Sequence, residues 1–173
     1  MGAAEFEIRP VKPAEADATL FRSIRLEALG ANPEAFGSSY EAEAAEPLSW
    51  FSARLVDSTV LGAFRDGQIV GIAGFRIQQG HKKAHKGMIW GMYVRPDARG
   101  AGIGRRLMEA VIELARHRVE LVQLTVVRGN EPARRLYAGL GFQEYGMESH
   151  AFKHDGCYYD EILMAMDLLG KSN

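Results

Sequence analysis

The segment VRPDARGAGIGRRLMEAVIELA (residues 94–115) places glycines at alternate positions, Gly100, Gly102 and Gly104, directly before an amphipathic helical pattern. Glycine has no Cβ, so its backbone adopts positive φ values and approaches a ligand closely. The first N–H groups of a helix lack partners within the helix, and the helix dipole is positive at that end. The segment therefore predicts a phosphate-binding turn. An ordinary capped helix is the alternative.

A dinucleotide-binding fingerprint does not explain these glycines, because its third glycine would stand where this chain has Leu107. Arginines surround the turn and are expected to offset phosphate charge. At Arg106 an ordinary solvated basic face is the favoured interpretation. The arginines of this group are Arg95, Arg99, Arg105 and Arg106.

Strand and helix patterns alternate along the whole chain. Apolar alternation or continuous apolar runs predict strands over residues 6–12, 60–77, 86–94, 120–127 and 145–168. The second and fifth of these runs are hairpins that turn at Asp66-Gly67 and at Asp155-Gly156. Helical periodicity predicts helices over residues 14–30 (capped by Gly30), 50–56 and 103–115, and a short one from residue 130 that ends at Gly139 or Gly141. A short acidic helical piece is also expected before Pro47. These elements predict one α+β domain with a mixed sheet over residues 1–173.

Composition narrows the class of partner. The chain has 21 basic and 22 acidic residues, a net charge of −1, whereas nucleic-acid and membrane-surface binding favour a basic excess. The single cysteine, Cys157, forms no intrachain disulfide, and the first ten residues lack the apolar core of a signal peptide. We therefore expect a cytoplasmic protein that binds neither nucleic acid nor membrane, and we assign no metal ligand.

The motif RGAGIG (residues 99–104) resembles the acyl-coenzyme A motif of the GNAT superfamily of N-acetyltransferases. The preceding GMYVRPDARG resembles the fourth strand of that family and its exit turn. NEPARRLYAGLGF (residues 130–142) resembles its second signature, an Asn, a Tyr and a closing Gly-Phe. The resemblance in element order extends from Phe6 to Leu168. It implies an α/β/α sandwich-like α+β fold, with a mixed, mostly antiparallel twisted sheet of about seven strands and about four helices.

The resemblance also implies an acyl donor, acetyl-CoA, and residues that bind it. Met92 and Val94 would offer backbone groups to the pantetheine arm, which lies beside the sheet like an added strand. Asn130 would hydrogen-bond the same arm. The backbone expected to cradle the pyrophosphate is that of Arg99, Gly100, Ala101, Gly102, Ile103 and Gly104.

Asn130 and Tyr137 are seven residues apart, about two helical turns, and so lie on one helix face. The resemblance implies that Tyr137 donates a proton to the departing thiolate. Proton transfer from a phenol of pKa about 10 to the thiolate of a thiol of pKa about 8.5 is only slightly unfavourable in free energy. The structural alternatives are an N-cap for Asn130, which precedes Glu131-Pro132, and simple packing for Tyr137.

The general base stays open at this point. Many relatives place a Glu on the fourth strand, but HKGMIWGMYV holds no carboxylate. The candidates are His85 at the start of that strand, Glu27 on the first helix, and Asp160 or Glu161 on the closing strand, with a water chain as a further route.

The acceptor pocket is expected between the first helices, the loop around residues 34–40 and the closing hairpin. Phe36, Ser38, Tyr159 and Asp160 are the candidate substrate-binding residues, with the aspartate attracting an ammonium group. The aromatic members of this set have hairpin or core packing as their alternative. Trp90 is expected in the core.

These observations predict acetyl transfer from acetyl-CoA to the primary amine of a small molecule, by direct attack in a ternary complex. Cys157 is not expected to carry the acetyl group. One alternative is an acetyltransferase of protein N-termini or lysines, which needs an open peptide groove. Another is a non-catalytic acyl-CoA sensor, which the presence of both Asn130 and Tyr137 disfavours. The resemblance also suggests that the protein forms a homodimer.

Overall fold

A computed structural model describes residues 5–170. Residues 1–4 and 171–173 lie outside that range, and so does the part of the signal-peptide prediction that concerns residues 1–4. The elements of the chain are β1 (Glu7–Pro10), α1 (Glu15–Ala31), α2 (Tyr40–Ala44), α3 (Leu48–Asp57), β2 (Thr59–Arg65), β3 (Gln68–Ile77), β4 (Lys86–Val94), α4 (Ile103–Arg116), β5 (Leu121–Val127), α5 (Glu131–Leu140), β6 (Gln143–His154) and β7 (Cys157–Asp167). Short 3₁₀ turns cover Pro33–Ala35 and Pro96–Ala98.

The seven strands form one mixed sheet in the order β1-β2-β3-β4-β5-β7-β6. Every neighbouring pair is antiparallel except β4 and β5, which are parallel. The mixed seven-stranded α+β fold is confirmed. The structure has five α-helices rather than four, because the acidic piece before Pro47 forms α2. Within residues 5–170 no helix has the length and apolar character that a membrane crossing requires.

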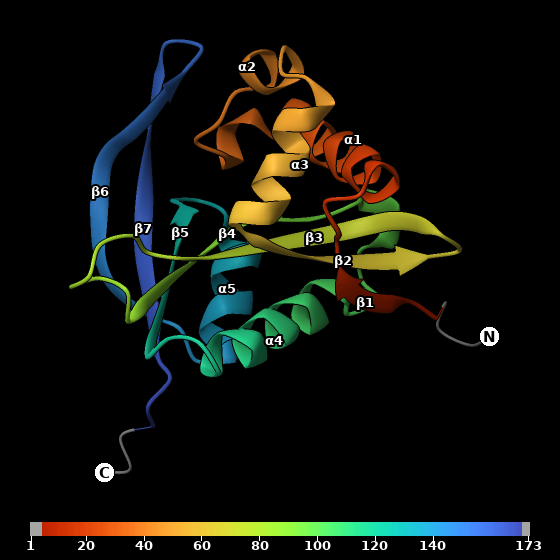
Figure 1. Cartoon of the computed structure of the whole chain (residues 1–173). Helices are drawn as coiled ribbons and strands as arrows, with labels where there is room; N and C mark the ends of the chain where they lie inside the picture. The colour runs from red at the N-terminus through yellow and green to blue at the C-terminus, as the bar shows by residue number, and fades with distance from the viewer. Residues whose placement is uncertain (1–4, 171–173) are drawn as a thin grey trace.

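Helices cover the two faces of the sheet, as Figure 1 shows, with α1–α3 on one face and α4 and α5 on the other. One apolar core lies under α4 and includes Ile103, Leu107 and Val111. The other lies under α1 and α3 and includes Phe21, Ile24, Phe51 and Leu55. Hairpin β6–β7 stands beside α1–α3 and reaches about the level of α2 in Figure 1, and its outer strand β6 is largely exposed.

Both predicted hairpin turns are present, with positive φ at Asp66, Gly67, Asp155 and Gly156. The predicted cap at Gly30 is wrong. The helix continues to Ala31, and its cap is Asn32, whose N–H donates to the Ala28 carbonyl. A Cβ at Gly30 would lie 3.4 Å from the Tyr40 ring, which is ordinary van der Waals contact, so this part of α1 faces the start of α2.

A bulge in β4 decides which face each of its side chains reaches. Ile72 pairs with Tyr93 and Gly74 pairs with Trp90, so β4 holds one residue more than β3 there. Gly91 takes the extra position with φ +64°, which favours glycine. Trp90 and Tyr93 consequently pack on the α1–α3 face, whereas Met92 packs on the α4 face. Without the bulge, strict alternation would put Trp90 and Tyr93 on opposite faces.

Strands β4 and β5 separate soon after they meet. Their parallel pairing covers only Lys86–Met88 against Leu121–Gln123. Beyond it β4 continues to Val94 and β5 to Val127. The facing backbone edges therefore open into a gap in the middle of the sheet, on the side of the α4 and α5 N-termini.

Candidate functional site

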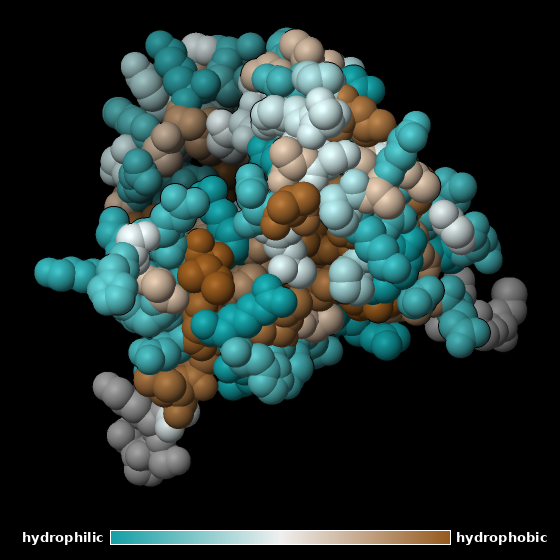
Figure 2. All heavy atoms as spheres, viewed as in Figure 1, coloured by the Kyte–Doolittle hydropathy of each residue, from teal (hydrophilic) through white to brown (hydrophobic). Residues whose placement is uncertain are grey.

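A cavity of about 1230 Å³ occupies the gap between β4 and β5 and extends to the α1–α3 side of the sheet. Figure 2 shows apolar side chains, brown, reaching the surface between α3 and α4, with hydrophilic ones, teal, around them. The cavity brings together most of the residues expected to bind the acyl donor. Those in its lining are Met92, Val94, Arg99, Gly100, Gly102, Ile103, Gly104, Asn130 and Tyr137. Ala101 is exposed and lies outside the lining.

The glycine turn forms one end of this cavity. Gly100 and Gly102 have φ values of +80° and +76°, and Gly102 is the N-cap of α4. No side chain caps this helix, and its first turn contains no acidic residue. The backbone N–H of Arg106 donates to the Gly102 carbonyl, so the intrahelical bonds begin there and leave the earlier N–H groups free. Unsatisfied donors at a helix N-terminus on a cavity wall suit a phosphate group.

The arginines near the turn have different contacts. The Arg99 Nε donates to the Val94 carbonyl at 3.0 Å, so that carbonyl already has one partner. Arg105 lines the cavity and lies 3.7 Å from Glu109 one turn along the helix. The Arg106 guanidinium lies over the Phe6 ring, 4.9 Å from its centroid, and is outside the lining.

Gly104 contributes close packing. Its φ is not in the left-handed region, and a Cβ there would lie 3.1 Å from the Met92 Cε. That distance is tighter than ordinary van der Waals contact, so a side chain at this position would require the end of the Met92 side chain to shift. Gly104 thus lies close against the Met92 side chain, where α4 begins beside β4.

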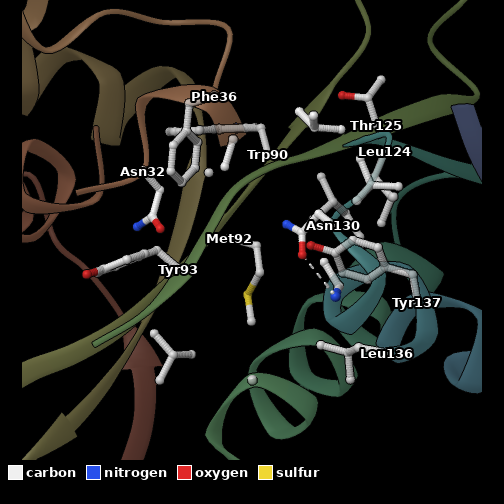
Figure 3. Close-up of a pocket in the computed structure, with 18 of the residues that line it drawn as sticks. Asn32, Phe36, Trp90, Met92, Tyr93, Leu124, Thr125, Asn130, Leu136 and Tyr137 are labelled. Carbon is white, nitrogen blue, oxygen red and sulfur yellow. Dashed lines mark hydrogen bonds between the residues drawn. The ribbon is translucent and has the colours of Figure 1, made fainter. Parts of the chain in front are cut away.

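Asn130 is the N-cap of α5 and also lines the cavity. Its Oδ1 accepts from the Ala133 N–H at 3.4 Å, which caps α5. The same side chain lines the cavity, and within residues 5–170 its amide nitrogen has no hydrogen-bond partner. Figure 3 shows the capping bond as a dashed line, with the amide beside the Tyr137 hydroxyl. The cap therefore orients the amide and leaves its N–H groups toward the cavity.

Tyr137 is buried, with 7% of its surface exposed, and its ring packs edge-on against Phe142 with centroids 6.1 Å apart. In Figure 3 its hydroxyl points from α5 toward Met92 and the centre of the cavity. Burial raises the pKa of Tyr137 from 10 to about 12. The phenol is therefore fully protonated at neutral pH, and it is a weaker acid than a tyrosine of ordinary pKa.

Among the base candidates, only Glu161 lines the cavity. Glu27 is held by Arg95, whose Nε is 2.9 Å from its Oε2, and by the Tyr93 hydroxyl at 3.1 Å. Burial raises the pKa of Glu161 and the charge of Glu148 adds to the effect, while a hydrogen bond from Thr125 opposes it. A partly desolvated carboxylate on the wall is a chemically suitable proton acceptor.

Asp160 and His85, the other two candidates, lie outside the lining. The Asp160 Oδ1 accepts from the His150 N–H at 2.9 Å, where β6 departs from regular pairing with β7. Its carboxylate therefore has a local structural partner, and the prediction that it attracts a substrate ammonium gains no support from its position.

The substrate-binding candidates divide in the same way. Phe36 and Ser38 line the cavity, whereas Tyr159 stacks on Phe152 across the β6–β7 hairpin, with centroids 5.1 Å apart, outside the lining. In Figure 3, Phe36 lies on one side of Met92 and Tyr137 on the other. The cavity therefore runs from the glycine turn, past the β4 edge, to the loop before α2.

Three arginines at this second end were not identified from the sequence. We call them the arginine wall: Arg25 on α1, Arg54 on α3 and Arg76 on β3, all in the cavity lining. Arg25 is 4% exposed and holds Glu43 through two bonds, Nε to Oε2 at 2.9 Å and Nη2 to Oε1 at 2.8 Å. Burial pushes the pKa of Glu43 up, but the hydrogen bonds and charge of Arg25 bring it below its usual value.

A sequence signal for Arg25 did exist. The buried positions of α1 are 18, 21, 24, 25, 28 and 29, so this arginine lies within the apolar stripe of the helix. A charged residue in such a stripe requires a partner and commonly marks a functional or ion-paired position. Trp90, expected in the core, is half-buried and lines the cavity. Its Nε1 is buried with no hydrogen-bond partner within residues 5–170.

Comparison with known proteins places this site in a family. Residues 23–142 match the model of the acetyltransferase (GNAT) family. The chain is 33% identical over 96 residues to the N-alpha-acetyltransferase RimI of Mycobacterium tuberculosis, a match that covers 56% of this chain and 59% of that protein. It is 26% identical over 140 residues to the L-methionine sulfoximine/L-methionine sulfone acetyltransferase of Pseudomonas paraeruginosa, covering 79% of this chain and 81% of that one.

A solved structure has the same fold over nearly the whole chain. The structure of yncA from Salmonella typhimurium with its cofactor acetyl-CoA matches with a TM-score of 0.80 and 22% identity, and covers 98% of this chain and 97% of that one. At this identity the match concerns the fold. The family match spans both the glycine turn and the Asn130–Tyr137 helix, the two segments that line one end of the cavity. The chain belongs to the GNAT acetyltransferase family and is an acyltransferase.

Proposed function

We propose that the protein transfers an acetyl group from acetyl-CoA to the primary amine of a small molecule, within one domain and one ternary complex. The observation that carries the proposal is a single cavity in which the uncapped α4 N-terminus, the Asn130 amide and the Tyr137 hydroxyl converge. Acetyl-CoA is the acyl donor of the family, and its thioester supplies the activated acyl group.

The residues of the chain fit such a donor. The free N–H groups at the start of α4 would hold a diphosphate, and the unpaired edge of β4 near Met92 would hold an amide-bearing arm in the manner of an added strand. The Asn130 amide nitrogen points to the same space. We refer to these residues, with Tyr137, as the donor wall.

Tyr137 is proposed as the general acid. Its pKa of about 12 keeps the proton available at neutral pH. Transfer to a thiolate of ordinary pKa about 8.5 would then be uphill. The same buried environment disfavours a charged thiolate and so raises the pKa of the thiol. The difference between the pKa of the phenol and that of the thiol therefore becomes smaller.

Glu161 is proposed as the general base, acting on the acceptor ammonium directly or through a water. It is the only one of the base candidates in the cavity lining. Its neighbour Ile162 packs in the core under α4, so Glu161 faces the α1–α3 side of the sheet, where we place the acceptor. A homodimer and a cytoplasmic location stay predictions.

The peptide-directed alternative has a specific reason to be tested, because one relative is named an N-alpha-acetyltransferase. A panel of amines, free amino acids and peptides, with release of the CoA thiol as readout, separates the alternatives. We expect turnover with small amines. Turnover confined to peptides would support the alternative, and acetyl-CoA binding without turnover on any acceptor would indicate a sensor.

The donor wall is tested by Gly102→Val. Acetyl-CoA should raise the melting temperature of the wild type, because a ligand at 100 times its Kd stabilises the folded state by about 2.7 kcal/mol. Valine at φ +76° strains the turn, so the shift should disappear. Gly80→Val is the matched control, since Gly80 has φ +100° in the turn before β4 and lies outside the cavity lining. A folded Gly102→Val protein with unchanged acetyl-CoA affinity would contradict the assignment.

A further inference from the structure

The arginine wall is assembled from three separate elements. Arg25 comes from α1, Arg54 from α3 and Arg76 from β3, and all three line the end of the cavity that also contains Phe36 and Ser38. The Arg25 and Arg54 guanidinium groups lie 5.7 and 4.9 Å from the centroid of the Trp90 ring on β4. Three like charges around one cavity end repel one another, so their convergence requires compensation.

The available carboxylates do not compensate all three. Glu43 is fully engaged by Arg25, and the Arg54 Nη1 lies 3.7 Å from the Glu43 oxygen that Arg25 already binds at 2.8 Å. Within residues 5–170, Arg76 forms no ion pair. Asp57 also lines this end, but it is exposed and is not ion-paired to an arginine of the described chain. One carboxylate thus serves two arginines, and the third has none.

Packing holds Arg54 in a partly desolvated position. Its guanidinium lies 4.7 Å from the centroid of the Trp50 ring, in addition to its contact with Trp90, and only 30% of its side chain is exposed. An arginine remains protonated in such a setting, because its pKa lies far above the physiological range. A fixed guanidinium with unused donors is well suited to bind a carboxylate through two hydrogen bonds.

We propose that the acceptor carries a carboxylate close to its amine, as a free α-amino acid does, and that Arg54 and Arg76 bind this carboxylate. The ammonium group then lies toward β5 and β7, where Glu161 lines the same cavity. This inference rests on the proposed function and specifies its substrate class. It also replaces Asp160 as the source of substrate charge recognition, since Asp160 lies outside the lining.

The arrangement separates a free amino acid from two other acceptors. A simple alkylamine lacks the anion and leaves the arginine wall unpaired. A peptide N-terminus has an amide where the amino acid has its carboxylate, so it presents no charge at that position. Losing a hydrogen bond to a charged group costs about 1.5–3 kcal/mol, or roughly 10- to 100-fold in kcat/KM. We therefore expect a preference of that size for the free acid.

The test compares three matched probes for each of L-methionine, L-leucine and L-phenylalanine: the amino acid, its carboxamide and its decarboxylated amine. A tripeptide with N-terminal alanine is added as a peptide probe. The wild type should acetylate at least one free acid about 10- to 100-fold more efficiently than its amide or amine. In Arg54→Gln this ratio should fall toward one, mainly through KM for the acid, and Arg54→Lys should keep part of it.

Arg76→Gln is the second variant, because Arg76 is exposed and its replacement leaves the buried pair intact. Arg116→Gln, on the outer face of α4 and outside the cavity lining, is the matched control and should keep the wild-type ratio. The ratio is measured within one variant, so a general loss of folded protein does not change it. Each variant is also checked for the acetyl-CoA-induced rise in melting temperature.

The outcomes separate the two levels of the proposal. Acetylation of amide, amine and acid with equal efficiency, or a preference for the tripeptide, would overturn the carboxylate assignment and leave acetyl transfer to amines intact. An unchanged ratio in both Arg54→Gln and Arg76→Gln would overturn the role of these arginines. Absence of CoA release with every probe, despite acetyl-CoA binding, would overturn the proposed function itself.

Discussion

The two ends of the cavity are built by different means. The donor wall comes from two short continuous segments, residues 92–104 and 130–137, and presents mainly backbone N–H groups and one helix N-terminus to the cavity. The arginine wall comes from single side chains on α1, α3 and β3, held by a buried ion pair and by aromatic rings. A binding surface made of backbone groups requires a local sequence pattern, whereas one made of single side chains requires only that the fold bring them together. The donor wall therefore has a motif that the arginine wall lacks.

The sharpest test of the donor wall is Tyr137→Phe. This change keeps the ring that packs on Phe142 and removes the proton, so kcat should fall by roughly 10²–10⁴ with acetyl-CoA affinity nearly unchanged. Steady-state kinetics with acetyl-CoA titrations measure both quantities. Full turnover in the variant, with chemistry shown to limit the rate, would reduce Tyr137 to a packing residue.

The arginine wall depends instead on Glu43. In Glu43→Ala the Arg25 guanidinium is left buried without its partner, so the free energy of unfolding should fall by about 3–5 kcal/mol in urea denaturation. Glu113→Ala is the matched control, because Glu113 pairs with Arg116 and His117 at the surface, and it should cost less than about 1 kcal/mol. Equal losses in the two variants would show that the buried pair does not hold this wall together.

Glu161 lines the cavity, and its proposed role as the base predicts a particular pH profile. A base acts when unprotonated, and the pKa of Glu161 is raised by burial, so kcat/KM should rise with pH at values above the usual range of a glutamate. Glu161→Gln should lose this acid limb and about 10²-fold in kcat. Thr125→Val removes the hydrogen bond that lowers this pKa and should move the limb to higher pH. If the acidic limb of the pH profile remained in Glu161→Gln, the limb would belong to another group.

The smallest effect is expected at Cys157. This thiol is exposed at the start of β7 and lies outside the cavity lining. Cys157→Ala should therefore keep its activity within about twofold, as surface substitutions do. Two-substrate kinetics should give intersecting lines, because in the proposed mechanism the amine attacks the thioester directly. An acetylated Cys157 that passes its acetyl group to the amine at a competent rate would contradict direct transfer.

The accuracy of the sequence predictions follows the range of the interactions involved. The hairpins at Asp66-Gly67 and Asp155-Gly156 are correct because their turn types depend on adjacent residues. The Gly30 cap is wrong because α1 continues through Gly30 to Ala31, and Gly30 lies within the helix, facing Tyr40 of a later segment. Tyr159 and Glu161 are two residues apart on β7, yet the sequence did not show that only Glu161 lines the cavity.

The sequence by itself determined the strand and helix order, the glycine turn with its free N–H groups, and the two-turn spacing that aligns Asn130 with Tyr137. Only the tertiary structure decided that β4 and β5 separate after Met88, that a bulge at Gly91 puts Met92 on the α4 face, and that two of the three arginines share one carboxylate. The physical reason is that backbone geometry is encoded by neighbouring residues, whereas burial, pKa and charge balance depend on groups brought together across the whole chain.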